Sequence, residues 1–440
     1  MGGGGSNPDP QSSYAEFRVQ NNIWGAKFLD RTSWDWLKGK GKDDSVPSHL
    51  WRIHDGLYDL EEFASRHPGG ESWIRITRGS DITEAFEASH VHPDVPEGLL
   101  KKYRVGEATW PRRSPFTFHP QGFYRTLKKR VGERLGKENG PTWKSRLFQD
   151  LLLVAFLLAF LRAAVTGARL WAVVTGTCLA LAINYAHNFF HMRDNVRMYV
   201  FDLSCWSSRE WRISHALSHH LFPNTILDAE IIMFYPFLDY LPRASKGFLL
   251  KYFSRIYINF LFPIFMPLDL TKRYLNAVVG KQSLHPENLL PLAELAILAF
   301  SRGFGEGLSL WMWIHGSCSV VFLIIGLTAA HHHEDIFHDG DRPSPDRDWG
   351  VGQLQAIGER TEVMGSPWLS GITFGDHILH HLFPTVDAFR LPALYPVLEE
   401  TCREFHVQFN RFTYPELVIG MYRQTGRTVT NPKIPISNCE

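Results

Sequence analysis

The chain has 440 residues, and its 46 Lys and Arg residues are balanced by 45 Asp and Glu residues. Net charge therefore gives no reason to expect a nucleic-acid partner. The five cysteines (Cys178, Cys205, Cys318, Cys402 and Cys439) form no CxxC pair, which argues against a disulfide framework and favours a reducing compartment. The 21 histidines are unusual because most of them are clustered.

Residues 1–30 lack apolar periodicity and are expected to be disordered. This polar start, rich in Gly, Ser, Asn and Pro, has no features of a cleavable signal peptide. Gly2 and Ser6 match the N-myristoylation pattern, although a flexible low-complexity segment matches it equally well.

Residues 31–109 predict a mixed α+β domain with strands at 51–53 and 57–60, a turn between them and a helix at 82–88. His67 begins a His-Pro-Gly-Gly motif, and His90 comes two residues after the predicted helix. Glycines after a ligand let the backbone approach a flat cofactor. Two imidazoles can fill both axial positions of a haem iron, which leaves electron transfer as its function. His92 is an alternative to His90 as the second ligand.

Acidic residues surround the expected haem pocket. They are Glu71, Asp81, Glu84 and Glu87. Such a rim can steer a basic redox partner towards the haem, although ordinary solvated helix faces look the same in sequence.

The next segment, residues 110–146, is predicted to be a basic linker. Between residues 101 and 146 there are 13 Lys or Arg residues and only three acidic ones. A basic excess directly before a hydrophobic run predicts that this side faces the cytosol, near anionic lipid.

Long apolar runs follow at 147–165, 170–190 and 310–330, and each could cross a bilayer. The run at 289–300 is short, and we predict that it pairs with the last span. The stretch at 248–268 mixes charges and prolines with aromatic residues, so we expect it to lie in the membrane interface. Four crossings in two hairpins would leave the N-terminal domain and the histidine clusters on one side.

Three histidine clusters have spacings that place imidazoles on one face of a helix. They are His187 and His191, then His215, His219 and His220, then His377, His380 and His381. Eight imidazoles exceed what one tetrahedral zinc ion uses, and they suit two metals of higher coordination number. A ninth ligand is expected from the adjacent His331, His332 and His333, with His333 preferred.

Polar residues near these clusters are candidates to orient the imidazoles through hydrogen bonds. They are Asn224, Asp228, Asp335 and Asp376. Each of them taken singly is more often an ordinary surface residue. The histidines elsewhere, such as His315 within a span, are expected to be packed or hydrogen-bonded side chains.

The motif at His67, together with His90, Trp51 and the Gly79-x-Asp81-x-Thr83 segment, resembles the cytochrome b5 family. That resemblance implies haem b with His67 and His90 as axial ligands. Residues from about 147 to 422 resemble the membrane fatty acid desaturase family, most clearly at His-His-Leu-Phe-Pro-Thr. This second resemblance implies two non-haem iron ions bound by the box histidines, with an acyl lipid and O2 as substrates.

The sequence therefore predicts an α+β haem domain followed by an all-α membrane domain with four transmembrane helices and a cytosolic histidine-rich helical cap. The expected divisions are 1–30 (disordered), 31–109 (haem domain), 110–146 (basic linker), 147–425 (desaturase-like domain) and 426–440 (tail). We predict an oxygen-dependent acyl-lipid desaturase of the endoplasmic reticulum membrane, reduced by a cytochrome b5 reductase-type donor. Tethering would raise the local concentration of the haem domain without needing a tight interface.

Three departures from the usual desaturase pattern leave alternatives open. The second box has three intervening residues where fused enzymes usually have two, the first reads His-Asn, and the third begins with His377 where Gln is common. One alternative is a haem electron carrier with a catalytically degenerate desaturase-like domain. The other is a diiron lipid hydroxylase.

Overall fold

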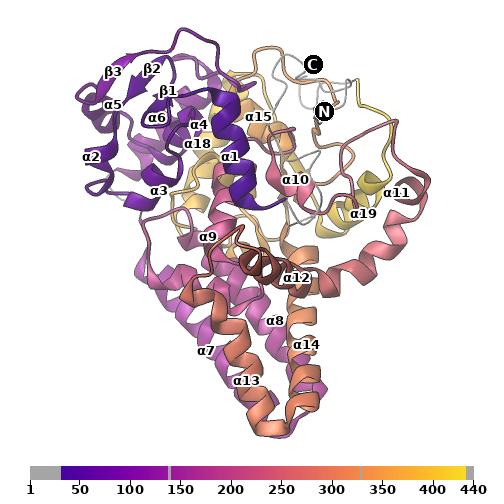
Figure 1. Cartoon of the computed structure of the whole chain (residues 1–440). Coiled ribbons are helices and arrows are strands. Elements are labelled where there is room, and N and C mark those ends of the chain that lie inside the picture. Colours follow the sequence, from indigo (N-terminus) through magenta and orange to yellow (C-terminus); the bar gives the residue numbers. More distant parts are fainter. Residues whose placement is uncertain (1–30, 137–139, 328–329, 433–440) are drawn as a thin grey trace, which may run out of the picture.

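The computed structural model describes residues 31–136, 140–327 and 330–432. The expected disorder of residues 1–30 and the acylation pattern at Gly2 lie outside these ranges. The described chain forms a small α+β domain, a bundle of long helices and a cap of short helices above that bundle (Figure 1).

The N-terminal domain is built on a three-stranded antiparallel sheet in the order β1-β2-β3. The predicted hairpin forms there, and the predicted helix at 82–88 is α4. The core of the domain is small, and Trp51 lies at its centre and donates a hydrogen bond to the Ile74 carbonyl (2.8 Å). The elements are α1 (Ser33–Asp44), β1 (Trp51–Ile53), β2 (Gly56–Tyr58), α2 (Glu61–Ala64), α3 (Glu71–Ile76), α4 (Thr83–Ser89), α5 (Asp94–Leu100) and β3 (Arg104–Glu107).

The segment predicted as a basic linker contains a packed helix, α6 (Phe123–Leu135). Its apolar side is fully buried, with Tyr124, Leu127 and Val131 each 0% exposed. Lys128, one of the basic residues in the sequence count, is also buried and pairs with Glu87. This part of the basic excess therefore stabilises the protein fold and does not face lipid headgroups.

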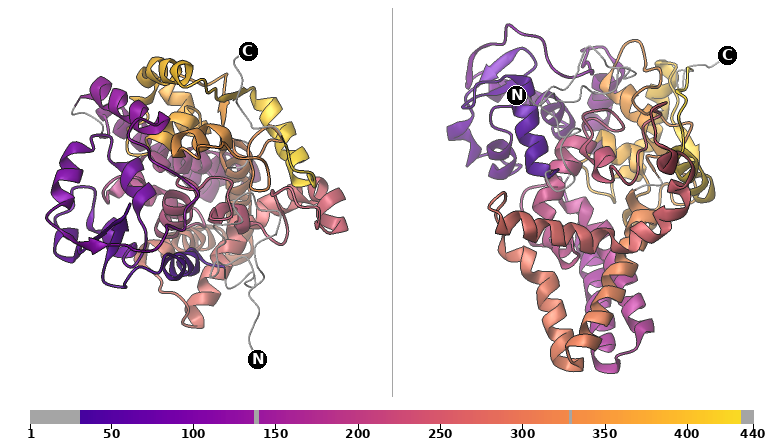
Figure 2. Two further views of the ribbon diagram at one scale, coloured as in Figure 1. Left: turned by 90° about the horizontal axis from the view of Figure 1, so that it is seen from above. Right: turned by 45° about the vertical axis from the view of Figure 1, so that its right-hand side comes forward.

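Two helical hairpins form the bundle, which points away from the cap (Figures 1 and 2). The first consists of α7 (Trp143–Thr166) and α8 (Arg169–Ala186), and the second of α13 (Leu290–Arg302) and α14 (Phe304–Val321). Three helical stretches are long and apolar enough to cross a membrane: Trp143–Thr166, Arg169–Phe189 and Phe304–Ile325. Helix α13 has 13 residues and so spans about 20 Å, less than a hydrocarbon core of about 30 Å. Three of the four predicted spans are thus candidates by length.

Helix α12 (Ser254–Val278) crosses the upper end of the bundle, where it packs against α14 (Figure 2). The interfacial location expected for residues 248–268, which include the first part of this helix, stays a prediction. Apolar side chains such as Ile256 and Phe260 are exposed on it, as are Phe300 and Phe304 at the tip of the second hairpin. Large apolar side chains remain exposed where a lipid phase can cover them.

The cap is made of short elements that connect and follow the hairpins. They are α9 (Ser208–Trp211), α10 (Ala229–Met233), α11 (Phe248–Tyr252), α15 (Trp349–Ala356), β4 (Gly358–Arg360), α16 (Pro367–Thr373), α17 (His377–Leu382), α18 (Tyr395–Glu404), β5 (Asn410–Phe412) and α19 (Tyr414–Thr425). The short strands β4 and β5 pair in parallel and join the C-terminal part of the cap to its centre. A π-helical segment, Arg212–His219, follows α9.

One hydrophobic core joins the N-terminal domain to the cap. Ala88 of α4 and Val91, two residues after that helix, belong to the same buried cluster as Tyr124 of α6 and Leu382 and Phe383 at the end of α17. The sequence suggested that a tether alone would suffice to keep the haem domain close, without needing a tight interface, and the structure adds such an interface. A continuous core holds the N-terminal domain in one position.

Candidate functional site

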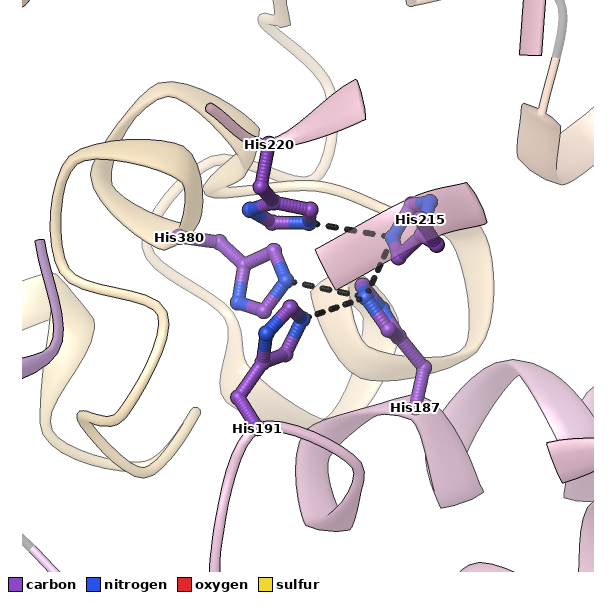
Figure 3. Close-up of side chains that lie close together, drawn as sticks. All are labelled: His187, His191, His215, His220 and His380. Atoms are coloured by element: carbon purple, nitrogen blue, oxygen red, sulfur yellow. Dashed lines mark hydrogen bonds between the residues drawn. The ribbon is translucent and has the colours of Figure 1, made fainter. Parts of the chain in front are cut away.

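Five histidines from all three boxes converge where the bundle meets the cap (Figure 3). His187 and His191 come from the end of α8 and the turn after it, His215 and His220 from the π-helical segment and its end, and His380 from α17. All five are buried, and their ligand nitrogens lie within 4.8 Å of one another. Residues almost 200 positions apart in the chain therefore form one group, which we call the first cluster.

The spacing in the first cluster fits a metal ion. The Nε2 atom of His187 lies 3.2 Å from that of His191, 2.8 Å from that of His215 and 3.0 Å from that of His380. Two nitrogens bound at right angles to one metal with bonds of about 2.1 Å would lie about 3 Å apart. Ordinary packing has no reason to bring several imidazole nitrogens this close.

A second cluster adjoins the first. It contains His219, His331 and His381, whose ligand atoms lie within 4.8 Å of one another. His377 joins it, because its Nε2 lies 2.6 Å from that of His331. The rings of His220 and His381 stack at 3.9 Å between centroids and so connect the two clusters. The nine imidazoles provide two neighbouring sites.

The local backbone explains why the second box serves both clusters. His220 donates its backbone N–H to the carbonyl of His215, five residues earlier, as in a π-helix (2.8 Å). This wider turn brings His215 and His220 to the first cluster and leaves His219 in the second. π-Helical turns are rare and recur at functional sites for this kind of reason.

Carboxylates and an amide fix the orientation of three rings. Asp228 accepts from Nδ1 of His219 (2.9 Å), and Glu230 lies at the same distance from Nδ1 of His215. The side-chain oxygen of Gln353 lies 3.2 Å from Nδ1 of His381. These contacts leave the Nε2 atoms directed at the clusters, which is how bound imidazoles are commonly held.

The sequence predicted only part of this supporting set. Asp228 was predicted, whereas Glu230 and Gln353 were missed because nothing in their spacing links them to a histidine. Asn224 acts on the backbone, since its amide donates to the His331 carbonyl (2.9 Å). Asp376 contacts no imidazole ring and accepts from the Tyr395 hydroxyl (2.9 Å).

The structure corrects the choice made within His331, His332 and His333. His331 lies in the second cluster, whereas His333 packs on the Phe412 ring at 4.2 Å and lies outside both clusters. Asp335 accompanies His333 and is equally remote from the clusters. His332 stacks on Tyr240 at 3.6 Å. The bonds from Asn224 to the backbone of this loop set its register, and no sequence pattern encodes them.

Burial keeps these imidazoles neutral, as metal binding requires. It lowers the pKa of His380 to about 3 and holds the pKa of His381 and His220 well below the ordinary value. His219 is the exception. Although burial opposes it, the Asp228 and Glu230 carboxylates raise the pKa of His219.

The N-terminal domain presents a separate pair of histidines, His67 and His90, whose ring centroids lie 6.2 Å apart. Nδ1 of His67 lies 2.9 Å from the Gly70 carbonyl, and Nδ1 of His90 lies 2.8 Å from the Phe86 carbonyl. Both Nε2 atoms thus remain available to an iron atom between the rings. A Cβ at Gly69 would lie only 2.9 Å from the His67 ring, which explains the glycine there. These features fit a bis-histidine haem.

His92, the alternative ligand, is exposed and faces away from His67. A Cβ at Gly132 of α6 would lie 3.1 Å from its ring nitrogen. His90 is the residue opposite His67, and burial lowers its pKa to about 4, so it is neutral at physiological pH.

Most residues of the predicted acidic rim are buried and not at the surface. Asp81, Glu84 and Glu87 are at most 4% exposed. Asp81 and Glu84 pair with Arg112, and Glu87 contacts Arg125, Lys128 and His54. Only Glu71 remains accessible, and it pairs with Arg75. Asp81, Glu84 and Glu87 therefore join the domain to the following segment and are too buried to steer a partner.

Two cavities approach the clusters. One is lined by His187, His377 and His380 together with Asn184, Asn188 and Phe374. The other is lined by Trp211, whose ring stacks on His215 at 4.1 Å, and has charged residues such as Arg273 and Glu210 on its wall. Each cavity therefore reaches a ring of the first cluster or the residue stacked on it.

Fold and site together define a membrane-associated redox protein in which a haem-type domain is joined to a multi-histidine centre. The family model described as "Fatty acid desaturase" matches residues 165–413, and the one described as "Cytochrome b5-like Heme/Steroid binding domain" matches residues 33–109. The chain belongs to the fatty acid desaturase family and carries an N-terminal cytochrome b5-like domain, which implies haem.

Individual relatives share this layout. The chain is 39% identical to the cytochrome b5-related protein of Drosophila melanogaster, over 92% of this chain and 94% of that protein. It is 25% identical to a probable Delta(5) fatty acid desaturase C of Dictyostelium discoideum, over 87% and 92% of the two chains. It is also 25% identical to the chloroplastic acyl-lipid (7-3)-desaturase of Chlamydomonas reinhardtii, over 86% and 80%.

Proposed function

We propose that this protein is an oxygen-dependent acyl-lipid desaturase that receives electrons from its own haem domain. The observation that carries the proposal is the assembly of nine buried imidazoles into two adjacent clusters, His187, His191, His215, His220 and His380 in one and His219, His331, His377 and His381 in the other. Each cluster would hold one non-haem iron, and His67 and His90 would hold the haem.

The reaction removes two hydrogens from neighbouring carbons of an acyl chain. A saturated –CH2–CH2– unit, O2, two electrons and two protons give –CH=CH– and two water molecules. Bound iron supplies the activation of oxygen that no side chain can supply. The histidines would hold one metal in each of the two adjacent clusters, and Asp228, Glu230 and Gln353 keep three of the rings in place. Phe374 and Leu391 provide the apolar part of the wall of the cavity beside His380.

We place the protein in the endoplasmic reticulum membrane with four crossings and with the haem domain and boxes in the cytosol. The short helix α13 would serve as the fourth span, because it runs beside α14 to the tip of the bundle (Figure 1). A cytochrome b5 reductase-type partner would supply the electrons. The close approach of nine imidazoles supports this enzyme over a haem carrier with a degenerate second domain.

The test is lipid profiling of a host that expresses the chain, with a His380→Ala variant as control. A desaturase yields acyl chains two mass units lighter, and the variant yields none. Purified protein should contain about two non-haem irons per chain, reduced in the variant. A product sixteen mass units heavier would identify a hydroxylase. Unchanged lipids together with haem iron alone would reject the proposal.

A further inference from the structure

The edge of the N-terminal domain that carries His67 and His90 faces the histidine-bearing segments of the cap. On the His90 side, the Thr385 hydroxyl donates to the carbonyl of Ser89, the residue before His90 (3.2 Å). Thr385 lies four residues after His381 in the third box. The end of one ligand-bearing segment therefore contacts the other directly.

Tyr124 forms a second link on the same side. Its buried hydroxyl lies 3.1 Å from the Leu382 carbonyl, next to His381, and 3.3 Å from the Glu87 carbonyl in α4. One side chain thus spans from the helix that ends at His90 to the helix that carries the third box. Its ring is 0% exposed and packs against Trp349 at 4.5 Å.

The His67 side is held by different residues. The indole N–H of Trp73, in the helix after the His-Pro-Gly-Gly motif, points at the Met192 carbonyl, one residue after His191 (3.4 Å). The Arg212 guanidinium lies 4.8 Å from the Trp73 ring centre and donates to the same Met192 carbonyl (2.9 Å). Arg212 begins the segment that carries the second box. The haem domain therefore touches segments that belong to all three boxes.

Buried charges strengthen this contact. Glu87 is 0% exposed and pairs with Arg125 and Lys128 of α6, which itself packs on the cap. The continuous core that includes Ala88, Val91 and Leu382 would have to open before the domain could move away. Exposing that much apolar surface and an unpaired buried carboxylate is costly.

We propose that the haem domain is a fixed donor that passes electrons only to the boxes of its own chain, with Tyr124 and Thr385 as positioning residues for the transfer. This inference rests on the function proposed above. Each transfer oxidises the haem by one electron and reduces the non-haem iron site by one electron. Two transfers serve each acyl chain oxidised, and a pyridine-nucleotide-linked reductase replaces the electrons.

A mixing experiment tests the restriction to one chain. Full-length His67→Ala, which keeps its boxes, is reconstituted in the same vesicles as full-length His380→Ala, which keeps its haem. We expect haem reoxidation and product formation in the mixture to stay below about one tenth of the wild-type rates, because no haem is held beside intact boxes. Recovery near the wild-type rates would overturn the inference. An inactive wild-type chain would count against the proposed function instead.

A measurement that needs no turnover tests the docking itself. Hydrogen exchange of the full-length haem protein should show strong and equal protection for residues 86–91 and 379–386, with no concentration dependence. Fast exchange confined to the Ala88 and Leu382 side of the interface would show a hinged domain and overturn the proposal.

The positioning role is tested with the double variant Tyr124→Phe and Thr385→Val, which removes two hydroxyls and keeps the shapes. Tyr422→Phe is the matched control, because its hydroxyl bonds Asn259 far from the haem domain (2.5 Å). We expect haem reoxidation after a single photoreduction to slow by about threefold or more in the double variant only. Haem absorbance and iron content should be unchanged in both. An unchanged reoxidation rate in the double variant would refute the role.

Discussion

The choice between His331 and His333 is the sharpest test of the site at a single position. His331→Ala removes a ring whose Nε2 lies 3.1 Å from that of His219 and 2.6 Å from that of His377. We expect this variant to lose about one of two non-haem irons, or to bind it at least about tenfold more weakly. Iron is measured by elemental analysis against protein and haem concentration.

His333→Ala is the natural control, because this adjacent residue packs on Phe412 and lies outside both clusters. Its iron content should equal that of the wild type. If His333→Ala lost iron and His331→Ala kept it, the ligand set assigned to the second cluster would be wrong.

Sequence predicted eight of the nine clustered histidines and missed the ninth for a physical reason. Each box contains histidines three or four residues apart, and on a helix that spacing places side chains on one face, which marks the boxes in the sequence. His331 lies in a loop, where three adjacent histidines point in different directions. Their directions depend on Asn224, which binds the His331, Phe337 and Ala356 carbonyls. Such a contact joins segments more than 100 residues apart, and no local pattern reports it.

Helix α4 carries Glu87, a buried carboxylate whose pKa is lowered by its partners and which stabilises the packing of this helix. Although burial alone would raise it, the hydrogen bond with His54 and the charges of Lys128 and Arg125 hold the pKa of Glu87 well below its ordinary value of 4.5. Because the folded pKa is the lower one, the stabilisation is complete above pH 4.5 and is lost as the pH falls further. We expect Glu87→Gln to lower the free energy of unfolding at pH 7 by about 3 kcal/mol.

The pH dependence separates this electrostatic effect from a packing defect. At pH 3 the difference in the free energy of unfolding between Glu87→Gln and wild type should shrink by about 2 kcal/mol. At that pH the Glu87 side chain of the unfolded wild type is protonated, whereas that of the folded protein remains ionised. Denaturant unfolding followed by haem absorbance measures both values. The exposed Glu62→Gln serves as control. A difference independent of pH would contradict the assigned cause.

The contact between α8 and α14 requires a glycine. A Cβ at Gly176 would overlap the carbonyl oxygen of Ile314 and the hydroxyl of Ser317. Small residues let membrane helices approach closely, so we expect Gly176→Ala to force the helices apart and cost about 1–3 kcal/mol. Thermal unfolding in detergent measures this cost. Gly316→Ala, also on α14 but facing α12, would place its Cβ 3.5 Å from the Pro263 carbonyl and should be tolerated.

The length of the apolar runs predicted the helices of the bundle. The π-helical turn and the packed helix α6 were missed, for reasons that lie in the structure. Runs of Leu, Ala and Phe identified α7, α8 and α14 because a lipid-facing helix needs little else. The π-helical turn at 212–219 could not be foreseen, since the same His-x-x-x-His-His letters also suit an α-helix. The packing of helix α6 was missed because its basic residues suggested a solvated linker. Lys128 and Arg125 pair with Glu87 of the N-terminal domain, and the local sequence does not show this contact.

The joining of the two domains was the largest feature that sequence reasoning missed. Each domain has a local signature, the His-Pro-Gly-Gly motif in one and the boxes in the other. Their interface has none, because Ala88 and Trp73 are ordinary apolar residues of their helices and Val91 is an ordinary apolar residue of the loop after α4. An interface between domains depends on which residues each folded domain leaves at its surface, and the local sequence pattern does not reveal them.

The direction of the chain through the membrane yields the last prediction. If α7, α8, α13 and α14 all cross, the two hairpin turns face one compartment and the cap faces the other. Arg169→Cys and Ser301→Cys sit at the turns, and Asp346→Cys sits on the cap, all at exposed positions. In sealed microsomes whose outer face is cytosolic, an impermeant maleimide should label only Asp346→Cys, in a background without native cysteines.

Detergent should then make the two turn positions reactive, which controls for intrinsic accessibility. Helix α13 decides the outcome, since its 13 residues cover about 20 Å and need either a thinned bilayer or the flanking residues 286–289 to complete the crossing. Labelling of Ser301→Cys before detergent, with Arg169→Cys still protected, would show that the second hairpin does not cross. The predicted count of four spans would then be wrong, while the two histidine clusters would remain on the face that bears the cap.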